Sequence, residues 1–270
     1  MRYYAIPKSP LPRKLYGSES EVAIRELTED ERFSIEDFFF KHDRKVSITA
    51  GTTAIVIDHS QLAKPIISEE IAVFVEFGLA LLTVSGFEPI SLMASLSQAG
   101  ECTDAFFRPT VESQIDAVFP AKMKEGASNI WFRQLLMVRK KSKDRLHITA
   151  DRFVRYSRIQ ETPDALLDLC ICLESLLDAE TEISFRFGIC LAKITRFDEA
   201  EELSYLLSDL YSLRSKLVHG ADASKPHKKV NPHLVRLRLA ARTILTNYII
   251  YLTSHTKEEW KTYLRSSLFA

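Results

Sequence analysis

An arginine and a histidine five positions apart are the residues best suited to chemistry in this chain of 270 residues. They are Arg214 and His219, in the stretch LYSLRSKLVHG, which ends at Gly220. Histidine titrates near neutral pH, and the carboxyl end of a helix favours its protonated form. The pair therefore offers a group that can exchange a proton near a permanent positive charge. The alternative is that these residues only end a helix.

The spacing of the pair limits how it can work. On an ideal helix, five positions separate two side chains by about 140° around the axis. Arg214 and His219 can therefore converge only if the helix loosens at its end, or if a second subunit supplies partners. An arginine five to seven residues before a histidine is also common by chance, so the surroundings must give the pattern its meaning.

The charge distribution around the pair is uneven, although the whole chain is neutral, with 36 basic and 36 acidic residues. From 161 to 209 the sequence has 12 acidic and three basic residues. From 213 to 243 one acidic residue, Asp222, stands against eight bases: Arg214, Lys216, Lys225, Lys228, Lys229, Arg236, Arg238 and Arg242. This basic segment suits a phosphate-bearing ligand such as RNA, with Lys216, Lys225, Lys228 and Lys229 as candidate contacts. The same bases could instead pair with the acidic helices or be solvated.

Helical periodicity dominates the chain from about Leu146 onwards. The pattern predicts helices over 148–159, from Pro163 to about 177, over about 182–194 and 198–218, and in a final stretch over 233–255. Gly220 is placed to cap the fourth of these helices. We therefore expect residues 146–270 to form an all-α bundle of four or five helices.

The first half has a mixed pattern, which predicts a small α/β domain over residues 1–145 and an α+β fold for the chain as a whole. Three prolines predict that the first 20 or so residues form an extended arm. Strands are expected at 21–27 and 45–59, with a turn near Gly51, and a helix is expected after Ser68. Residues 85–110 are expected to be rich in loops, and 129–146 fits either a strand or a helix.

Other features of the sequence point away from specialised chemistry. The four cysteines show no metal-binding spacing, which is typical of reduced, buried thiols in a cytoplasmic protein. The longest apolar run, 71–87, contains Glu76 and is shorter than the roughly 20 residues needed to cross a bilayer. Asp58, His59 and Ser60 have the residue types of a hydrolase triad, but neighbours on a strand point apart. The basic stretch RKKSKDR near 145 is more typical of a solvated linker than of an RNA contact.

Three motifs together resemble the HEPN superfamily (higher eukaryotes and prokaryotes nucleotide-binding), and within it the ApeA-like group. They are DALLDLCICLESLL, AETEISFRFG and LYSLRSKLVHG, and the resemblance covers about residues 146–252. It implies a metal-independent endoribonuclease without a cofactor, acting as a homodimer whose two arginine–histidine motifs face one cleft. A place in an antiviral defence or toxin-like system is implied in the same way. The first half only loosely resembles the region that often precedes this domain, where a sensing or targeting role would lie.

The resemblance carries the catalytic residues over to Arg214 and His219. His219 would move a proton while the 2′-hydroxyl of RNA attacks the neighbouring phosphorus, and Arg214 would hold the non-bridging oxygens. Glu174 would either orient Arg214 or pair with another base. Ser215 would bond a phosphate or a helical carbonyl, and Tyr211 is expected to pack rather than to stack on a base. Many relatives do not cut RNA, so a non-catalytic module that binds RNA, a nucleotide or a protein partner is the alternative, and a structural dimer a third.

Overall fold

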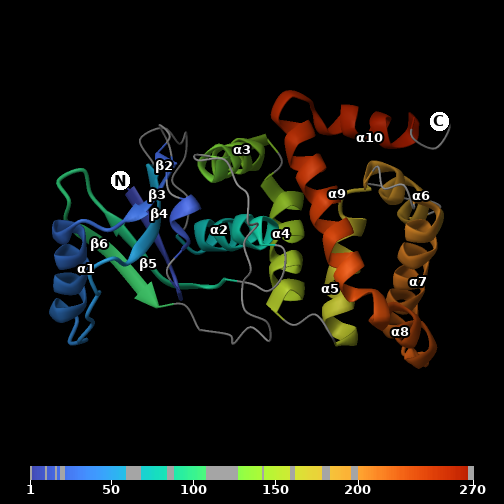
Figure 1. The fold of residues 1–270 in the computed structure, drawn as a ribbon, viewed down its shortest axis with the longest axis horizontal. Coiled ribbons are helices and arrows are strands. Elements are labelled where there is room, and N and C mark those ends of the chain that lie inside the picture. Colours follow the sequence, from blue (N-terminus) through green and yellow to red (C-terminus); the bar gives the residue numbers. More distant parts are fainter. Residues whose placement is uncertain are drawn as a thin grey trace. The chain divides into compact units, whose positions relative to one another are not determined.

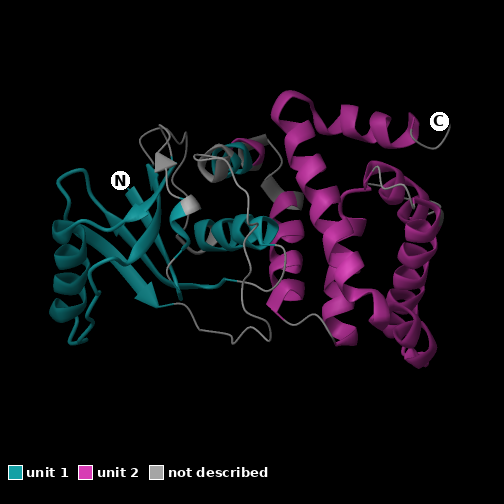
Figure 2. Ribbon diagram, viewed as in Figure 1, with its two compact units in different colours: residues 1–136 teal, residues 137–270 magenta. Residues whose placement is uncertain are grey.

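The computed structural model describes residues 2–9, 11–15, 17–18, 22–58, 68–83, 88–107, 127–141, 143–158, 162–177, 183–195 and 200–266. The chain divides into two compact units, residues 1–136 and 137–270 (Figure 2). The boundary expected from the sequence lies about nine residues further along the chain. The first unit contains the sheet and the second is helical, so the fold class is α+β, as predicted.

The described part of the first unit contains one antiparallel sheet of six strands in the order β2-β3-β4-β1-β5-β6 (Figure 1). The strands are β1 (Arg2–Pro7), β2 (Gly17–Ser18), β3 (Val22–Glu26), β4 (Thr53–Asp58), β5 (Ile90–Leu96) and β6 (Cys102–Phe107). The strand predicted at 21–27 is confirmed as β3, and the part of 45–59 that follows Gly51 is confirmed as β4, whereas residues 45–50 were wrongly expected to form a strand. Gly51 itself has a φ of 82°, a conformation that glycine adopts without strain.

Two other expectations about the first half are wrong. Residues 2–7 are not part of an arm, because β1 lies inside the sheet between β4 and β5 and is buried on both faces. The first proline ends the strand at Pro7 rather than preventing it, because proline is tolerated where the ladder stops. The region expected to be rich in loops contains β5 and β6, which pair as a hairpin. Its alternation is hard to recognise because alanines and serines hold many of its positions.

Two helices of the first unit lie on opposite sides of the sheet (Figure 1): α1 (Glu29–Lys41) and α2 (Ser68–Leu82). The predicted helix after Ser68 is confirmed, whereas α1 was not anticipated. The start of α1 is a capping box, in which Thr28 and Glu31 each accept from the other's backbone N–H. Ile35 and Phe39 of α1 pack on Tyr4, Ile6 and other apolar side chains of one sheet face.

Helices make up the described part of the second unit. Those that lie in it or enter it are α3 (Ala127–Lys141), α4 (Lys143–Arg158), α5 (Pro163–Glu174), α6 (Ile183–Thr195), α7 (Ala200–Val218), α8 (Ser224–Val230), α9 (Leu234–Ser254) and α10 (Lys257–Ser266). Residues 129–141, which fitted either a strand or a helix, are helical. The helices predicted over 163–177, 182–194, 198–218 and 233–255 are confirmed as α5, α6, α7 and α9, whereas α8 and α10 were not anticipated. Short 3-10 helices occur at Arg13–Leu15 and Asn231–His233.

The helices that carry the candidate residues pack closely. Gly188 of α6 faces α7, and a Cβ atom added to it would lie 2.6 Å from Oγ of Ser208 and 3.1 Å from the carbonyl oxygen of Ser204. A glycine therefore lets α6 and α7 approach each other at this point. On α10, the indole of Trp260 is buried and donates to the carbonyl of Leu176, 3.0 Å away. No helix in the described ranges is long and apolar enough to cross a membrane.

Candidate functional site

The carboxyl end of α7 places His219 just outside the helix. The N–H of Gly220 donates to the carbonyl of Leu217 over 3.3 Å, and the N–H of Ala221 donates to that of Lys216 over 2.9 Å. Together with the φ of 65° at Gly220, these bonds form a Schellman motif. The predicted glycine cap is confirmed. Its consequence is that the chain turns sharply after His219, instead of carrying that residue further along the helix.

Arg214 lies in the last turns of α7, next to a carboxylate from α5. Its Nε atom is 3.3 Å from Oε2 of Glu174, and the two side chains are 27% and 21% exposed. This distance makes an ion pair, but Nε lacks a properly aligned hydrogen bond. Glu174 was expected either to orient Arg214 or to pair with another base, and the structure contains the contact with Arg214. The pair is mostly buried, so solvent screens it less than a surface pair.

The ring of Tyr211 supports the arginine from the same helix. The guanidinium carbon of Arg214 is 5.7 Å from the centroid of this ring, within the range of a cation–π contact. The centroid of the Tyr211 ring also lies 5.5 Å from that of the Phe187 ring in α6. Burial and the nearby Glu174 carboxylate raise the pKa of Tyr211, against the opposite effect of Arg214. Tyr211 is thus a packed residue, as expected from the sequence.

His219 is exposed, in contrast to Arg214. Within the described ranges, no hydrogen bond, ion pair or ring contact joins its imidazole to another residue, Arg214 included. The imidazole is therefore open to solvent or to a ligand, at the helix end where the dipole stabilises a positive charge. The two residues of the motif are in one helix end but in different environments.

Ser215 and the lysines surround this helix end. Ser215 is half-buried, and the described residues provide no hydrogen-bond partner for its hydroxyl, neither a helical carbonyl nor a side chain. Lys216 is half-buried, and three exposed lysines lie on α8: Lys225, Lys228 and Lys229. Lys229 reaches Asp209 of α7 over 3.2 Å, and Arg236 of α9 reaches Glu202 over 2.9 Å. The basic segment is thus partly paired with acidic residues of α7, which is the alternative that its charge pattern left open.

Two cysteines lie close to the arginine but are not set up as nucleophiles. Cys170 and Cys172 are fully buried in α5, and Cys170 is one turn before Glu174. Burial raises the pKa of both thiols, and the neighbouring Glu174 and Asp168 carboxylates raise it further. Because the thiolate is the reactive form, these cysteines serve the core. The prediction that they pack in the core is confirmed.

The remaining candidates contribute little to a site. His59 and Ser60 lie outside the described residues, so the proposed triad types at 58–60 cannot be placed. The same holds for the side chains of the RKKSKDR stretch at 139–145. The part of the chain that the structure describes contains no group of three histidine, cysteine or acidic side chains that could hold a metal ion.

Some features of this site were not visible in the sequence. The contact of Phe187 with Tyr211 joins residues 24 positions apart, and only the crossing of α6 over α7 brings them together. A signal was present in Gly188, since a glycine inside a helical pattern often marks a close helix crossing.

Comparison of the chain with known protein families, with curated proteins and with solved structures found no match.

Proposed function

We propose that this protein is a metal-independent endoribonuclease of the HEPN type, with Arg214 and His219 at its reactive centre. One observation carries the proposal: an exposed, unpartnered imidazole follows the helix end at which a carboxylate and an aromatic ring hold an arginine. A structural histidine would be expected to cap or pack, and this one does neither among the described residues.

The chemistry needs only proton transfer and charge stabilisation. The 2′-oxygen of a nucleotide loses its proton and attacks the adjacent phosphorus, and the bond from phosphorus to the 5′-oxygen of the next nucleotide breaks. The products are a 2′,3′-cyclic phosphate and a 5′-hydroxyl, which takes up one proton. His219 is the group to exchange these protons. Arg214 stabilises the additional negative charge on the non-bridging oxygens.

The lysines near the helix end supply the attraction for the RNA backbone. Lys225 and Lys228 are exposed, whereas Lys229 is already near Asp209. We therefore expect Lys225 and Lys228 to contribute more to phosphate binding than Lys229. Binding through these residues weakens with added salt, because counterions are released from the phosphates. A role in antiviral defence or a toxin-like system follows from the resemblance alone.

The ion pair of Arg214 favours a second candidate function. Since Glu174 already neutralises Arg214, the helix end also suits a HEPN module that binds RNA, a nucleotide or a protein partner without cutting. The two functions differ in one requirement. Cleavage needs the imidazole of His219, whereas binding through the lysines does not.

The deciding experiment is cleavage of a mixed RNA panel in EDTA by the wild type, His219→Ala and Arg214→Ala. His255→Ala and Arg236→Ala are matched controls, because His255 is an exposed histidine at the C-cap of α9 and Arg236 is ion-paired with Glu202. Loss of at least about a hundredfold in the rate is expected for His219→Ala and Arg214→Ala alone, with 2′,3′-cyclic phosphate ends in the wild type. Equal activity in all five proteins would indicate a contaminating nuclease. RNA binding without cleavage in any of them would favour the non-catalytic module.

A further inference from the structure

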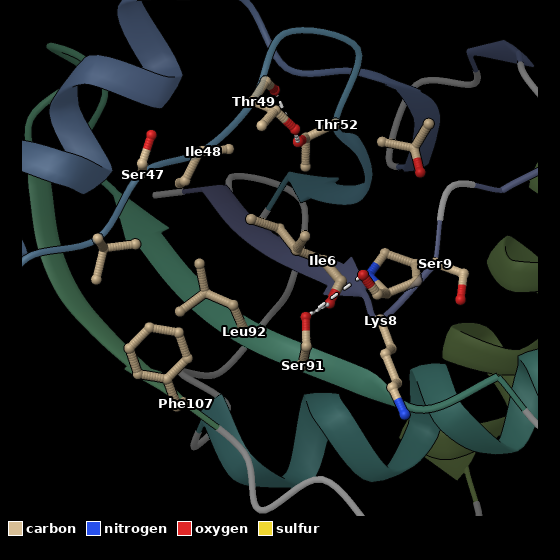
Figure 3. Close-up of a pocket in the computed structure, with 13 residues that line it drawn as sticks. Ile6, Lys8, Ser9, Ser47, Ile48, Thr49, Thr52, Ser91, Leu92 and Phe107 are labelled. Atoms are coloured by element: carbon tan, nitrogen blue, oxygen red, sulfur yellow. Dashed lines mark hydrogen bonds between the residues drawn. The ribbon is translucent and has the colours of Figure 1, made fainter. Parts of the chain in front are cut away.

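A cavity of about 260 Å³ opens in the amino-terminal unit, on the sheet face that α1 covers (Figure 3). Its floor is a row of three side chains, Ile6 of β1, Leu92 of β5 and Phe107 of β6, which are paired directly across the strands. Ile48, in the segment that joins α1 to β4, forms part of the wall. The floor is therefore apolar and continuous across three strands.

The cavity forms where β1 and β4 stop pairing at one end of the sheet. Pairing between β1 and β4 stops at Ala5 and Ile55, whereas β1 stays paired with β5 as far as Pro7 and Ile90. The chain before β4 turns away over residues 49–52. Ile6 and Leu92 of this row are buried, whereas Phe107 is 49% exposed although its ring stacks on that of Phe39 at 4.9 Å.

Three hydroxyl groups that line the cavity, those of Ser9, Ser47 and Thr53, donate to no acceptor in the described parts of the chain. Ser91 donates to the carbonyl of Ile6 over 3.0 Å, and Thr52 donates to that of Thr49 over 2.8 Å. Thr53 accepts from the N–H of Leu11 over 3.0 Å, but its own proton has no acceptor in the described parts of the chain. The hydroxyl of Ser47 has no partner there either. Thr53 is only 2% exposed, so the hydroxyls that a ligand can reach are those of Ser9 and Ser47, which are exposed.

Size and charge narrow the class of ligand. Pockets for drug-sized molecules hold about 300–1,000 Å³, so this cavity suits one ring system with a small substituent. An apolar floor that ends in an exposed aromatic ring suits a flat, stacking group. Among the lining residues that the structure describes, Lys8 is the one with a charged side chain, and Figure 3 shows it extending away from Ser47 and Ile48, beyond the floor. An anionic substituent would therefore lie at the mouth.

We infer that this cavity binds a nucleobase whose phosphate remains at the mouth near Lys8, as in a nucleoside monophosphate. The base rests on Phe107, and its carbonyl oxygens or ring nitrogens accept from Ser47. The same chemistry is offered by a free mononucleotide and by the terminal nucleotide of an RNA strand. The inference concerns the first unit and does not depend on RNA cleavage by the second.

The test is calorimetric titration of the full chain with uridine and adenosine monophosphates, ribose 5-phosphate and an RNA hexanucleotide. Because a hexanucleotide can also reach the lysines of α8, binding is assigned to the cavity only where Ser47→Leu, which fills it, abolishes that binding. We expect a dissociation constant below about 1 mM for at least one monophosphate and none for ribose 5-phosphate. Binding of the hexanucleotide alone, lost in Ser47→Leu, would identify an RNA end as the ligand.

Four further variants complete the test. Phe107→Ala should weaken binding about fivefold or more through lost stacking, and Lys8→Gln a few-fold through lost charge. Phe40→Ala is the matched control, an exposed phenylalanine of the same unit that does not line the cavity. Thermal unfolding of each variant shows that the fold is retained. His219→Ala should bind as the wild type does, which separates this inference from the proposed cleavage. No binding at about 10 mM ligand, or equal binding by Ser47→Leu and the wild type, would overturn the inference.

Discussion

Arg214 is shared between two neighbours, the carboxylate of Glu174 and the ring of Tyr211. Both contacts restrict the side chain, which carries considerable rotamer freedom when it is exposed. A restrained guanidinium loses less entropy when it binds a phosphate, since its position is already set. At the scale of the residue, Glu174 therefore reduces the net charge of the site but improves the geometry of its arginine.

The substitution Glu174→Gln tests this balance. It should lower the free energy of unfolding by about 1–2 kcal/mol, because a mostly buried guanidinium loses its counter-charge. It should also lower kcat for RNA cleavage about tenfold, because Arg214 is no longer held in place. Urea unfolding and steady-state cleavage measure the two effects. Asp168→Asn is the control: it removes the ion pair of the same helix with Arg152 of α4, and it should lower stability without changing kcat.

At the scale of the element, hydrogen bonds to the carboxylate of Glu31 attach α1 to the sheet. Glu31 accepts from both terminal nitrogens of Arg25 in β3 at 2.7 Å, from the hydroxyl of Tyr4 in β1 at 2.8 Å and from the N–H of Thr28 at 2.9 Å. Burial by itself would raise the pKa of Glu31, but these hydrogen bonds outweigh it and lower the pKa to about 2. The ionised form of Glu31 therefore stabilises the fold.

The substitution Glu31→Gln should make this contribution measurable. Since the pKa is about 2 in the folded protein and 4.5 ordinarily, the stabilisation is complete above pH 4.5 and is lost as the pH falls from 4.5 towards 2. We expect Glu31→Gln to be less stable than the wild type by about 1–2 kcal/mol at pH 7, a modest value because the network is partly solvated. The gap should narrow between pH 5 and pH 3 in urea unfolding. Asp37→Asn, which removes an exposed ion pair with Lys41, should show no such difference in stability from the wild type at pH 5 or at pH 3.

At the scale of the whole molecule, the proposed reaction needs more groups than one helix end supplies. The reaction proposed above removes one proton and delivers another, whereas the motif of one chain contains a single imidazole, that of His219. The angle of about 140° between positions 214 and 219 on a helix also separates the two side chains. Two chains with their helix ends at one cleft would supply both groups, which is the physical reason for proposing a homodimer.

Mixing two inactive variants tests this arrangement. If Arg214 of one chain acts with His219 of another, equal amounts of Arg214→Ala and His219→Ala exchange subunits, and half of the dimers carry one intact pair. About a quarter of the wild-type cleavage rate should then return on mixing. Each variant alone should remain inactive, and the wild type mixed with either variant calibrates the exchange. No recovery despite subunit exchange would place both residues of the site in one chain.

The helices of the second half could be predicted because their signals are local. Leu166, Leu169 and Leu173 repeat at helical spacing and are buried in α5, and Pro163 begins that helix. The sheet was harder to predict. β1 was missed because its partners, β4 and β5, are about 50 and 90 residues away, so its place in the sheet depends on contacts that no short window contains.

The candidate site divides in the same way. Local patterns were enough to identify the residue types, the helix that carries Arg214, and the glycine that ends this helix after His219, since helix periodicity and capping depend on neighbours a few positions apart. The packed helices were needed to show that Glu174 is the partner of Arg214, and that the imidazole of His219 has none among the described residues. The physical reason is that such contacts depend on how α5, α6 and α7 pack, which is set by the shape of the whole core.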